Sequence, residues 1–326
     1  MTEANNNLLK VDDLKTYFAI RKGLLRRTVG FVKAVDGVSF AVKSTTTFGL
    51  VGESGCGKTT AARSILRLIP VTSGKVTFDN TDILAADADR LRELRSKISL
   101  IFQDPFGSLN PRMTVGSILG EPLKVHKKIT GPDLADHVRL IISKVGLSPD
   151  HINRYPHEFS GGQRQRIGIA RALILQPKFV ICDEPVSALD VSIQSQILNL
   201  LKDLQGEFSL TYLFIAHDLA VVQFSCDIVA VMYMGRIVEQ AHVGELYSNP
   251  LHPYTVALMS AIPSIKANRP ITGRRLSGEV PSILTPPPGC PFNPRCPFAE
   301  DRCLTEIPPL KPVPDKNEHL IACWHI

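Results

Sequence analysis

The sequence lacks any run of about 18 apolar residues, the length that a helix needs to cross a bilayer. It also lacks a sustained heptad repeat, so no long coiled coil is expected. Residues 1–7 are polar and do not show the basic and then apolar pattern of a secretory signal. These absences predict a chain that stays inside the cell and does not itself cross the membrane.

The charge balance is mildly basic, with a net charge of +6 that suits an anionic ligand or an anionic membrane face. The one local concentration of cations is at residues 21–27, RKGLLRR, where a solvated loop is favoured over a lipid or nucleic-acid contact. No aromatic-interleaved basic stripe follows, so no nucleic-acid partner is expected. The length of 326 residues suggests about two domains, or one domain with insertions.

A glycine-rich turn carries the strongest chemical signal. Residues 52–59, GESGCGKT, fit the phosphate-loop pattern G-x-x-x-x-G-K-[ST], with an apolar run before them and a segment of helical composition after them. Glycines let successive N–H groups turn inward, and a helix N-terminus adds positive charge, so main chain holds most of a triphosphate. Lys58 is expected at the β and γ phosphates of ATP, and the Thr59 hydroxyl on Mg²⁺. The expected nucleotide contacts are Gly52, Glu53, Ser54, Gly55, Cys56, Gly57, Lys58, Thr59 and Thr60.

An acidic pair follows a second apolar run, at residues 179–182. In phosphate-loop ATPases an acidic residue at the end of such a strand holds Mg²⁺, which is the role expected of Asp183. Glu184 follows directly and is expected to polarise the water that attacks the γ phosphate. The alternative interpretation is a helix cap, because acidic pairs are common at strand ends.

Apolar runs alternate with helical patterns along most of the chain. The expected strands are residues 8–11, 35–42, 48–51, 98–102, 179–182 and 211–216, and a hairpin of 228–232 with 237–239. The expected helices are residues 85–97, 167–173 and 193–204, together with an inserted helical segment at 114–146 that breaks at Gly131-Pro132. The alternation predicts an α/β fold with a mainly parallel sheet covered on both faces. Beyond residue 250, prolines such as Pro263, Pro270, Pro281 and 286–288 predict a mostly irregular tail.

A second glycine turn opens the helix at 167–173, with Ser160 as a good N-cap. Its residues Ser160, Gly161, Gly162 and Gln163 match the signature of ATP-binding cassette (ABC) transporter ATPases. Residues 183–185 (DEP), 187–190 (SALD) and His217 then follow in that family's order, so residues 8–240 resemble an ABC ATPase.

The resemblance implies a phosphate-loop NTPase core, with a RecA-like parallel sheet, an antiparallel β subdomain and an inserted helical subdomain. It divides the chain into core (1–104), helical subdomain (105–166), core (167–250) and a cysteine-rich C-terminal extension (251–326). It also implies a head-to-tail dimer, in which the signature of one subunit closes on the phosphate loop of the other. The residues 44–47, STTT, depart from the glycine-glutamate turn usual in the family.

Four further roles follow from the resemblance. Tyr17 resembles the aromatic residue that stacks on adenine, and Gln103 resembles the glutamine that senses Mg²⁺ and the attached permease. Asp190 resembles the aspartate of the dimer contact, and His217 resembles the γ-phosphate histidine. Without the resemblance, Tyr17 would be interpreted as packing and His217 as structural.

A narrower resemblance, to the ATPases of dipeptide and oligopeptide importers, rests on residues 103–112 (QDPFGSLNPR), 252–255 (HPYT) and the Cys-Pro-rich tail. It implies a peripheral ATPase subunit at the cytoplasmic face of the inner membrane. The implied partners are a second ATPase subunit, two transmembrane permease subunits and an extracytoplasmic peptide-binding protein. Some relatives with this tail carry nickel or glutathione, which are the alternative substrates. The rival functions are a soluble ABC protein acting on DNA or ribosomes, and a regulatory module that binds ATP without hydrolysing it.

The cysteines are distributed unevenly. Cys56, Cys182 and Cys226 are scattered through the first 230 residues. Cys56 is expected to fill the loop next to the phosphates, Cys182 to be inert packing in an apolar strand, and Cys226 to be buried. The other four are Cys290, Cys296, Cys303 and Cys323, in the last 37 residues. Because a cytosolic chain should not depend on disulfides, this group indicates metal, and four thiolates match a [4Fe–4S] cluster with a structural role. Zinc and metal-free reduced thiols are the alternatives, and the peptide-importer resemblance favours iron–sulfur.

Overall fold

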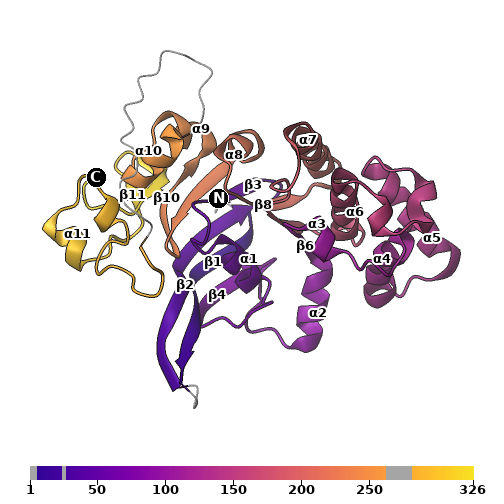
Figure 1. The fold of residues 1–326 in the computed structure, drawn as a ribbon, viewed down its shortest axis with the longest axis horizontal. Coiled ribbons are helices and arrows are strands. Elements are labelled where there is room, and N and C mark those ends of the chain that lie inside the picture. The colour runs from indigo at the N-terminus through magenta and orange to yellow at the C-terminus, as the bar shows by residue number, and fades with distance from the viewer. Residues whose placement is uncertain (1–5, 24–26, 262–280) are drawn as a thin grey trace, which may run out of the picture. The chain divides into compact units, whose positions relative to one another are not determined.

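The computed structural model describes residues 6–23, 27–261 and 281–326. Residues 1–5, residues 24–26 of the basic cluster, and Pro263 and Pro270 of the tail lie outside the described residues. The described chain divides into two compact units (Figure 1). The first unit is built mainly from residues 85–215, and the second mainly from residues 9–41, 47–84 and 216–326. In the described ranges, no helix combines the length and the apolar character needed to span a membrane.

The first unit contains three parallel strands, β6 (Ile98–Ile101), β7 (Phe179–Asp183) and β8 (Thr211–Ala216). Every residue of β7 is buried, as is typical of a central strand covered on both faces. The register pairs Ile101 with Cys182, so β6 and β7 end at the same edge. This confirms the predicted parallel arrangement of the three strands.

The helices of the first unit begin with α2 (Ala88–Lys97) and α3 (Pro105–Ser108). The inserted segment contains α4 (Val115–Pro122), the π-helix η1 (Leu123–Lys127), α5 (Gly131–Lys144), and the short 3₁₀ turns η2 (Pro149–Asn153) and η3 (Pro156–Glu158). Two further helices follow, α6 (Gly161–Leu173) and α7 (Val191–Phe208). The predicted break at Gly131 is confirmed, because α5 begins there with Pro132 in its first turn, where a proline needs no hydrogen-bond partner. Figure 1 shows α4, α5 and α6 gathered together.

The second unit contains a four-stranded sheet in the order β2-β1-β4-β5. Its strands are β1 (Asn7–Lys22), β2 (Arg27–Lys43), β4 (Ser73–Phe78) and β5 (Thr81–Asp82), and β4 pairs antiparallel with both β1 and β5. The predicted strands at 8–11 and 35–42 are therefore only parts of two longer strands. The outer half of β2 is mostly exposed, Val29 and Phe31 included, so it has no buried face of the kind from which the strands were predicted.

The other strands of the second unit follow the order β11-β12-β10-β9-β3. They are β3 (Thr47–Val51), β9 (Ile228–Tyr233), β10 (Arg236–His242), β11 (Lys311–Val313) and β12 (Lys316–Ile321). β3 is parallel to β9, and β9 and β10 form the predicted hairpin. The helices are α1 (Lys58–Ile65), α8 (Leu219–Ser225), α9 (Val243–Ser248), α10 (Pro253–Ser260), the 3₁₀ turn η4 (Asn293–Arg295) and α11 (Asp301–Thr305).

The C-terminal extension is more regular than the sequence predicts. β12 pairs antiparallel with β10, with Glu239 opposite Ile321, and β11 pairs with β12. The prediction of a mostly irregular tail was wrong at these strands and at α10. The strands were missed because their pairing partner, β10, lies about 80 residues earlier in the sequence, so no local signal marks them.

The connector at residues 44–47 turns without glycine. Thr45 has a left-handed backbone, with φ of 61°, and its N–H donates to the Thr211 hydroxyl at 2.8 Å. The Thr46 hydroxyl donates to the Lys43 carbonyl at 2.8 Å. Side-chain hydrogen bonds therefore stabilise a turn that threonine adopts less readily than glycine.

Candidate functional site

The phosphate loop joins the buried strand β3 to helix α1, as predicted. Gly52 and Gly57 have φ of 149° and 109°, in the region that favours glycine. A Cβ on Gly52 would lie 2.1 Å from the Met232 carbonyl oxygen, and one on Gly57 would lie 2.1 Å from that of Ala34. Both positions therefore require glycine for space as well as for conformation.

Lys58 lies inside this loop and is only 5% exposed. Its Nζ donates to the carbonyl oxygens of Gly52 and Glu53, at 2.7 and 3.0 Å. The positive end of the α1 dipole and the Lys58 ammonium group lie at the same place. No acidic residue in the first turn of α1 offsets their positive charge. This is an arrangement suited to a phosphate group.

The other loop residues occupy the places that the pattern predicts. Ser54 and Gly55 are exposed at the turn, and Thr59 and Thr60 lie in the first turn of α1. Cys56 is buried, which raises the pKa of its thiol, so it packs as a neutral side chain. The interpretation of Cys56 as packing is consistent with this placement.

Gln103 and Glu184 meet at the edge where β6 and β7 end. The Gln103 Nε2 donates to Glu184 Oε2 at 2.9 Å. This contact follows from the parallel register, since Gln103 comes two residues after β6 and Glu184 directly follows β7. The structure therefore brings together two of the three residues predicted to be catalytic.

The backbone of Glu184 is held in an uncommon conformation. Its φ is 47°, which is rare for a residue with a side chain, and such strain is found preferentially at functional sites. Its N–H donates to the Ile215 carbonyl at 3.0 Å, and its carbonyl accepts from the Ser187 hydroxyl at 3.1 Å. These bonds hold the Glu184 backbone and so fix the direction in which its side chain points. Asp183, the last residue of β7, is 5% exposed.

The signature residues form the N-terminus of α6. Ser160 Oγ accepts from the Gln163 N–H at 3.4 Å, and Gln163 Oε1 accepts from the Ser160 N–H at 3.0 Å. This reciprocal capping box begins the helix earlier than the predicted residue 167. A Cβ on Gly162 would lie 2.6 Å from the Ile193 Cγ2, so glycine also lets α7 approach. Gly161 lies beside Gly162 in the first turn of α6.

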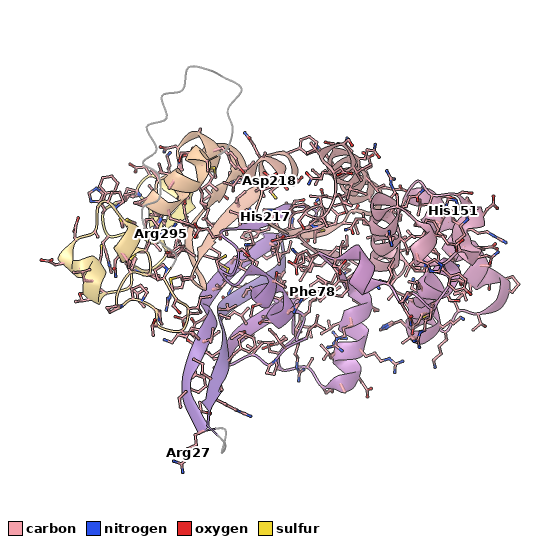
Figure 2. All side chains as sticks on the ribbon, viewed as in Figure 1. Arg27, Phe78, His151, His217, Asp218 and Arg295 are labelled. Atoms are coloured by element: carbon pink, nitrogen blue, oxygen red, sulfur yellow. The ribbon has the colours of Figure 1, made fainter. Side chains whose placement is uncertain are left out.

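The remaining predicted residues lie at the ends of other elements. Asp190 is the exposed N-cap residue of α7, and His217 is exposed directly after β8 (Figure 2). Tyr17 lies on β1, where its hydroxyl donates to Asp36 and Lys33 Nζ lies 5.7 Å from the ring centroid. Burial and then the Asp36 hydrogen bond raise the pKa of Tyr17 to about 12, so the phenol stays neutral. Its predicted stacking on adenine stays a prediction.

Thr59 belongs to one compact unit, and Gln103 and Asp183 belong to the other. Their predicted convergence on a single Mg²⁺ therefore stays a prediction. The residue types fit, because hydroxyl, amide and carboxylate oxygens are ligands that Mg²⁺ accepts.

The four C-terminal cysteines lie near enough to influence one another electrostatically, and all are free thiols. Burial raises the pKa of Cys290 to about 11 and also raises the pKa of Cys296 and Cys323. In residues 281–326 and the other described ranges, no group of three or more His, Cys, Asp or Glu side chains is arranged to hold a metal. The structure therefore does not support the predicted [4Fe–4S] ligation by Cys290, Cys296, Cys303 and Cys323.

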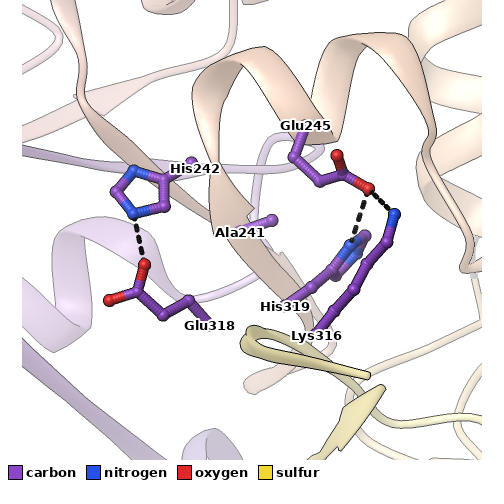
Figure 3. Close-up of a pocket in the computed structure, with 6 residues that line it drawn as sticks. All are labelled: Ala241, His242, Glu245, Lys316, Glu318 and His319. Carbon is purple, nitrogen blue, oxygen red and sulfur yellow. Dashed lines mark hydrogen bonds and ion pairs between the residues drawn. The ribbon is translucent and has the colours of Figure 1, made fainter. Parts of the chain in front are cut away.

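A separate pocket lies beside β10, α9 and β12, and Figure 3 shows the polar contacts among its side chains. His242 Nε2 lies 2.8 Å from Glu318, and Lys316 forms an ion pair with Glu245. His319 Nδ1 lies 3.6 Å from Glu245. The lining residues are Ala241, His242, Glu245, Lys316, Glu318 and His319.

Two residues that contact the phosphate loop were not predicted. Arg295 forms an ion pair with Glu53, and the Tyr254 hydroxyl accepts from the Glu53 N–H at 2.9 Å. Tyr254 belongs to the HPYT sequence that resembles the peptide-importer ATPases, but the sequence gives it no role. Arg295 carries no signal beyond its place between two cysteines.

Comparisons with known proteins agree with this geometry. An ABC transporter family model matches residues 35–187, and a model for the C-terminal region of oligopeptide/dipeptide transporters matches residues 238–303. The oligopeptide transport ATP-binding protein AppF of Bacillus subtilis is 51% identical, covering 99% of both chains. The oligopeptide transport ATP-binding protein OppF of Salmonella typhimurium is 52% identical, covering 99% of this chain and 98% of its own length.

Solved structures agree on the fold. A dimeric ATP-binding cassette in a post-hydrolysis state with ADP and Pi superposes with a TM-score of 0.64 at 26% identity, covering 72% of this chain and 98% of its own. The cbiO1 protein of Clostridium perfringens, part of an ABC transporter complex, has a TM-score of 0.64 at 27% identity, covering 75% and 92%. The predicted ABC ATPase fold is thereby confirmed.

Proposed function

This chain belongs to the ABC transporter family of oligopeptide transport ATP-binding proteins, so we propose that it hydrolyses ATP for a peptide importer. The observation that carries the ATPase function is the hydrogen bond between Gln103 and Glu184, because it orients a carboxylate at the sheet edge where a general base is needed. The similarity to oligopeptide transport proteins extends over nearly the whole chain, which supports di- or oligopeptides as the transported substrate.

The proposed mechanism assigns each step to residues of this chain. Lys58 and the loop amides hold the β and γ phosphates of ATP, and Glu184 polarises the attacking water. His217 contacts the γ phosphate, and Gln103 keeps the Glu184 carboxylate oriented through its amide. When bound, Mg²⁺ neutralises phosphate charge, and the chain offers Thr59, Gln103 and Asp183 to hold it.

The proposed assembly contains two ATPase subunits arranged head to tail. The N-terminus of α6, with Ser160 as its cap, closes over the ATP that the other subunit holds, and Asp190 contributes to the contact between subunits. Two transmembrane permease subunits and an extracytoplasmic peptide-binding protein complete the importer. The chain then works as a peripheral subunit at the cytoplasmic face of the inner membrane.

Co-purification with membrane partners, followed by ATPase assays of the reconstituted importer, tests the substrate. We expect short peptides, delivered by the peptide-binding protein, to stimulate hydrolysis, and glutathione and Ni²⁺ to leave it at the basal rate. Stimulation by glutathione or Ni²⁺ alone would establish the alternative import function. A subunit that hydrolyses ATP and binds no permease would instead be a soluble ABC ATPase.

The [4Fe–4S] cluster is a prediction of the sequence alone, and the described residues do not support it, because they include no group arranged to hold a metal. Iron and acid-labile sulfide, measured on anaerobically purified protein, test it directly. About four of each per chain would establish the cluster. Zinc, or no metal, would reject it.

A further inference from the structure

Glu53, the second residue of the phosphate loop, forms hydrogen bonds through its carboxylate, its N–H and its carbonyl. Its carboxylate accepts two hydrogen bonds from Arg295, from the Nη1 and Nη2 atoms, at 3.0 and 3.2 Å. Its N–H donates to the Tyr254 hydroxyl at 2.9 Å, and its carbonyl accepts from Lys58 Nζ at 3.0 Å. One residue therefore links the C-terminal extension to the lysine of the loop.

The Arg295–Glu53 pair is shielded from water. The side chains are 5% and 25% exposed, and the arrangement is bidentate, the geometry in which an Arg–carboxylate pair is strongest. The Arg295 guanidinium also lies 5.9 Å from the centroid of the Tyr233 ring. Burial alone would lower the pKa of Arg295, but its hydrogen bonds to Glu53 and Tyr233 raise it, so the guanidinium stays cationic.

An aromatic cluster holds this part of the extension in place. The Tyr233 ring lies 4.6 Å from that of Tyr254 and 5.3 Å from that of Phe292, between centroids. Phe292 precedes the 3₁₀ turn η4, which ends at Arg295. The turn that presents Arg295 is thereby packed against β9, the strand next to β3.

Because Glu53 carries a negative charge, its contact with Arg295 affects how strongly the loop attracts a nucleotide. A triphosphate brings several negative charges to a loop whose second residue is a carboxylate, and like charges in a partly buried site repel. Arg295 cancels the charge of Glu53 and leaves Lys58 as the cation that meets the phosphates. An unpaired Glu53 would offset part of the attraction that Lys58 supplies.

We propose that Arg295 is a positioning residue of the ATP site: through Glu53 it neutralises and holds the phosphate loop, so the C-terminal extension takes part in nucleotide binding. This inference rests on the proposed ATPase function and assigns Tyr254 a supporting role. If the contact were purely structural, the charge of Glu53 would not affect the affinity for nucleotide.

A double-mutant cycle separates the two roles. The affinity of the full-length chain for Mg²⁺ with a non-hydrolysable ATP analogue is measured by calorimetry for wild type, Arg295→Gln, Glu53→Gln and the double variant. We expect Arg295→Gln to weaken binding about ten-fold and to raise the KM for ATP while kcat stays near wild type. Glu53→Gln removes the repulsive charge and should bind at least as tightly as wild type. The double variant should recover most of the loss.

Two further variants serve as controls. Arg295→Lys keeps the charge but not the bidentate contact, so it should lose less affinity than Arg295→Gln, while thermal unfolding reports on the fold of each variant. Arg302→Gln removes another Arg–Glu pair of the extension, with Glu306, that does not reach the loop, and should leave the affinity unchanged. Unchanged affinity in Arg295→Gln, or weaker binding in Glu53→Gln that adds to it in the double variant, would overturn the inference. If Arg295→Gln does not fold, weaker binding in Glu53→Gln alone would overturn it. Failure of the wild type to bind the analogue would instead overturn the proposed function.

Discussion

Replacing Glu184 by Gln is expected to lower steady-state ATP hydrolysis by about 10²–10⁴-fold, the usual contribution of a general base. The amide has nearly the same shape but cannot accept a proton, and the backbone bonds to Ile215 and Ser187 keep it in place. Because the proposed phosphate contacts are the loop and Lys58, the Kd for ATP should stay close to the wild-type value. Phosphate release and calorimetric titration measure the two quantities separately.

The matched control for this variant is Glu93→Gln. Glu93 lies on the exposed face of α2 in ion pairs with Arg90 and Lys97, so the same chemical change there should leave turnover intact. Turnover in Glu184→Gln that matches the control would show that another group activates the water.

Replacing Lys58 by Ala is expected to weaken ATP binding by about 30- to 5,000-fold, because truncating one partner of a buried charge pair costs about 2–5 kcal/mol. The change also leaves the carbonyls of Gly52 and Glu53 without the ammonium that joins them. Hydrolysis should fall in proportion at limiting ATP. Titration with Mg²⁺-ATP measures the loss.

Lys97→Ala provides the comparison for that loss. Lys97 lies in the last turn of α2 and pairs with Glu93 at the surface, where an ion pair contributes little, about 0–1 kcal/mol. It should bind ATP like the wild type. If Lys58→Ala also binds like the wild type, the loop is not the phosphate site.

The sequence predicts the parts of this site that depend on neighbouring residues. The phosphate loop follows from its own glycines, whose replacement would place a Cβ against the Met232 or Ala34 carbonyl. The positions of Gln103 and Glu184 follow from the apolar runs that precede them, whereas the contact between the two side chains, 81 residues apart in the sequence, was not predicted. In both cases the determining pattern spans only a few residues.

The sequence does not predict contacts that depend on distant segments. Arg295 and Glu53 are 242 residues apart, and nothing local to either residue selects the other. The full length of β1 and β2 was also missed, and the outer half of β2 is mostly exposed rather than part of the core. The cysteine intervals suggested a cluster, but spacing along the chain does not fix the directions of four thiols.

The proposed ATPase dimer requires ATP to lie between the phosphate loop of one subunit and the signature turn of another. The most direct test is a structure of the assembled ATPase subunits, with the Glu184→Gln variant used to retain Mg²⁺-ATP. We expect Ser160 of the partner subunit to lie within hydrogen-bond distance, about 3 Å, of the γ phosphate that contacts Lys58. A signature turn far from every γ phosphate in all assemblies would contradict it.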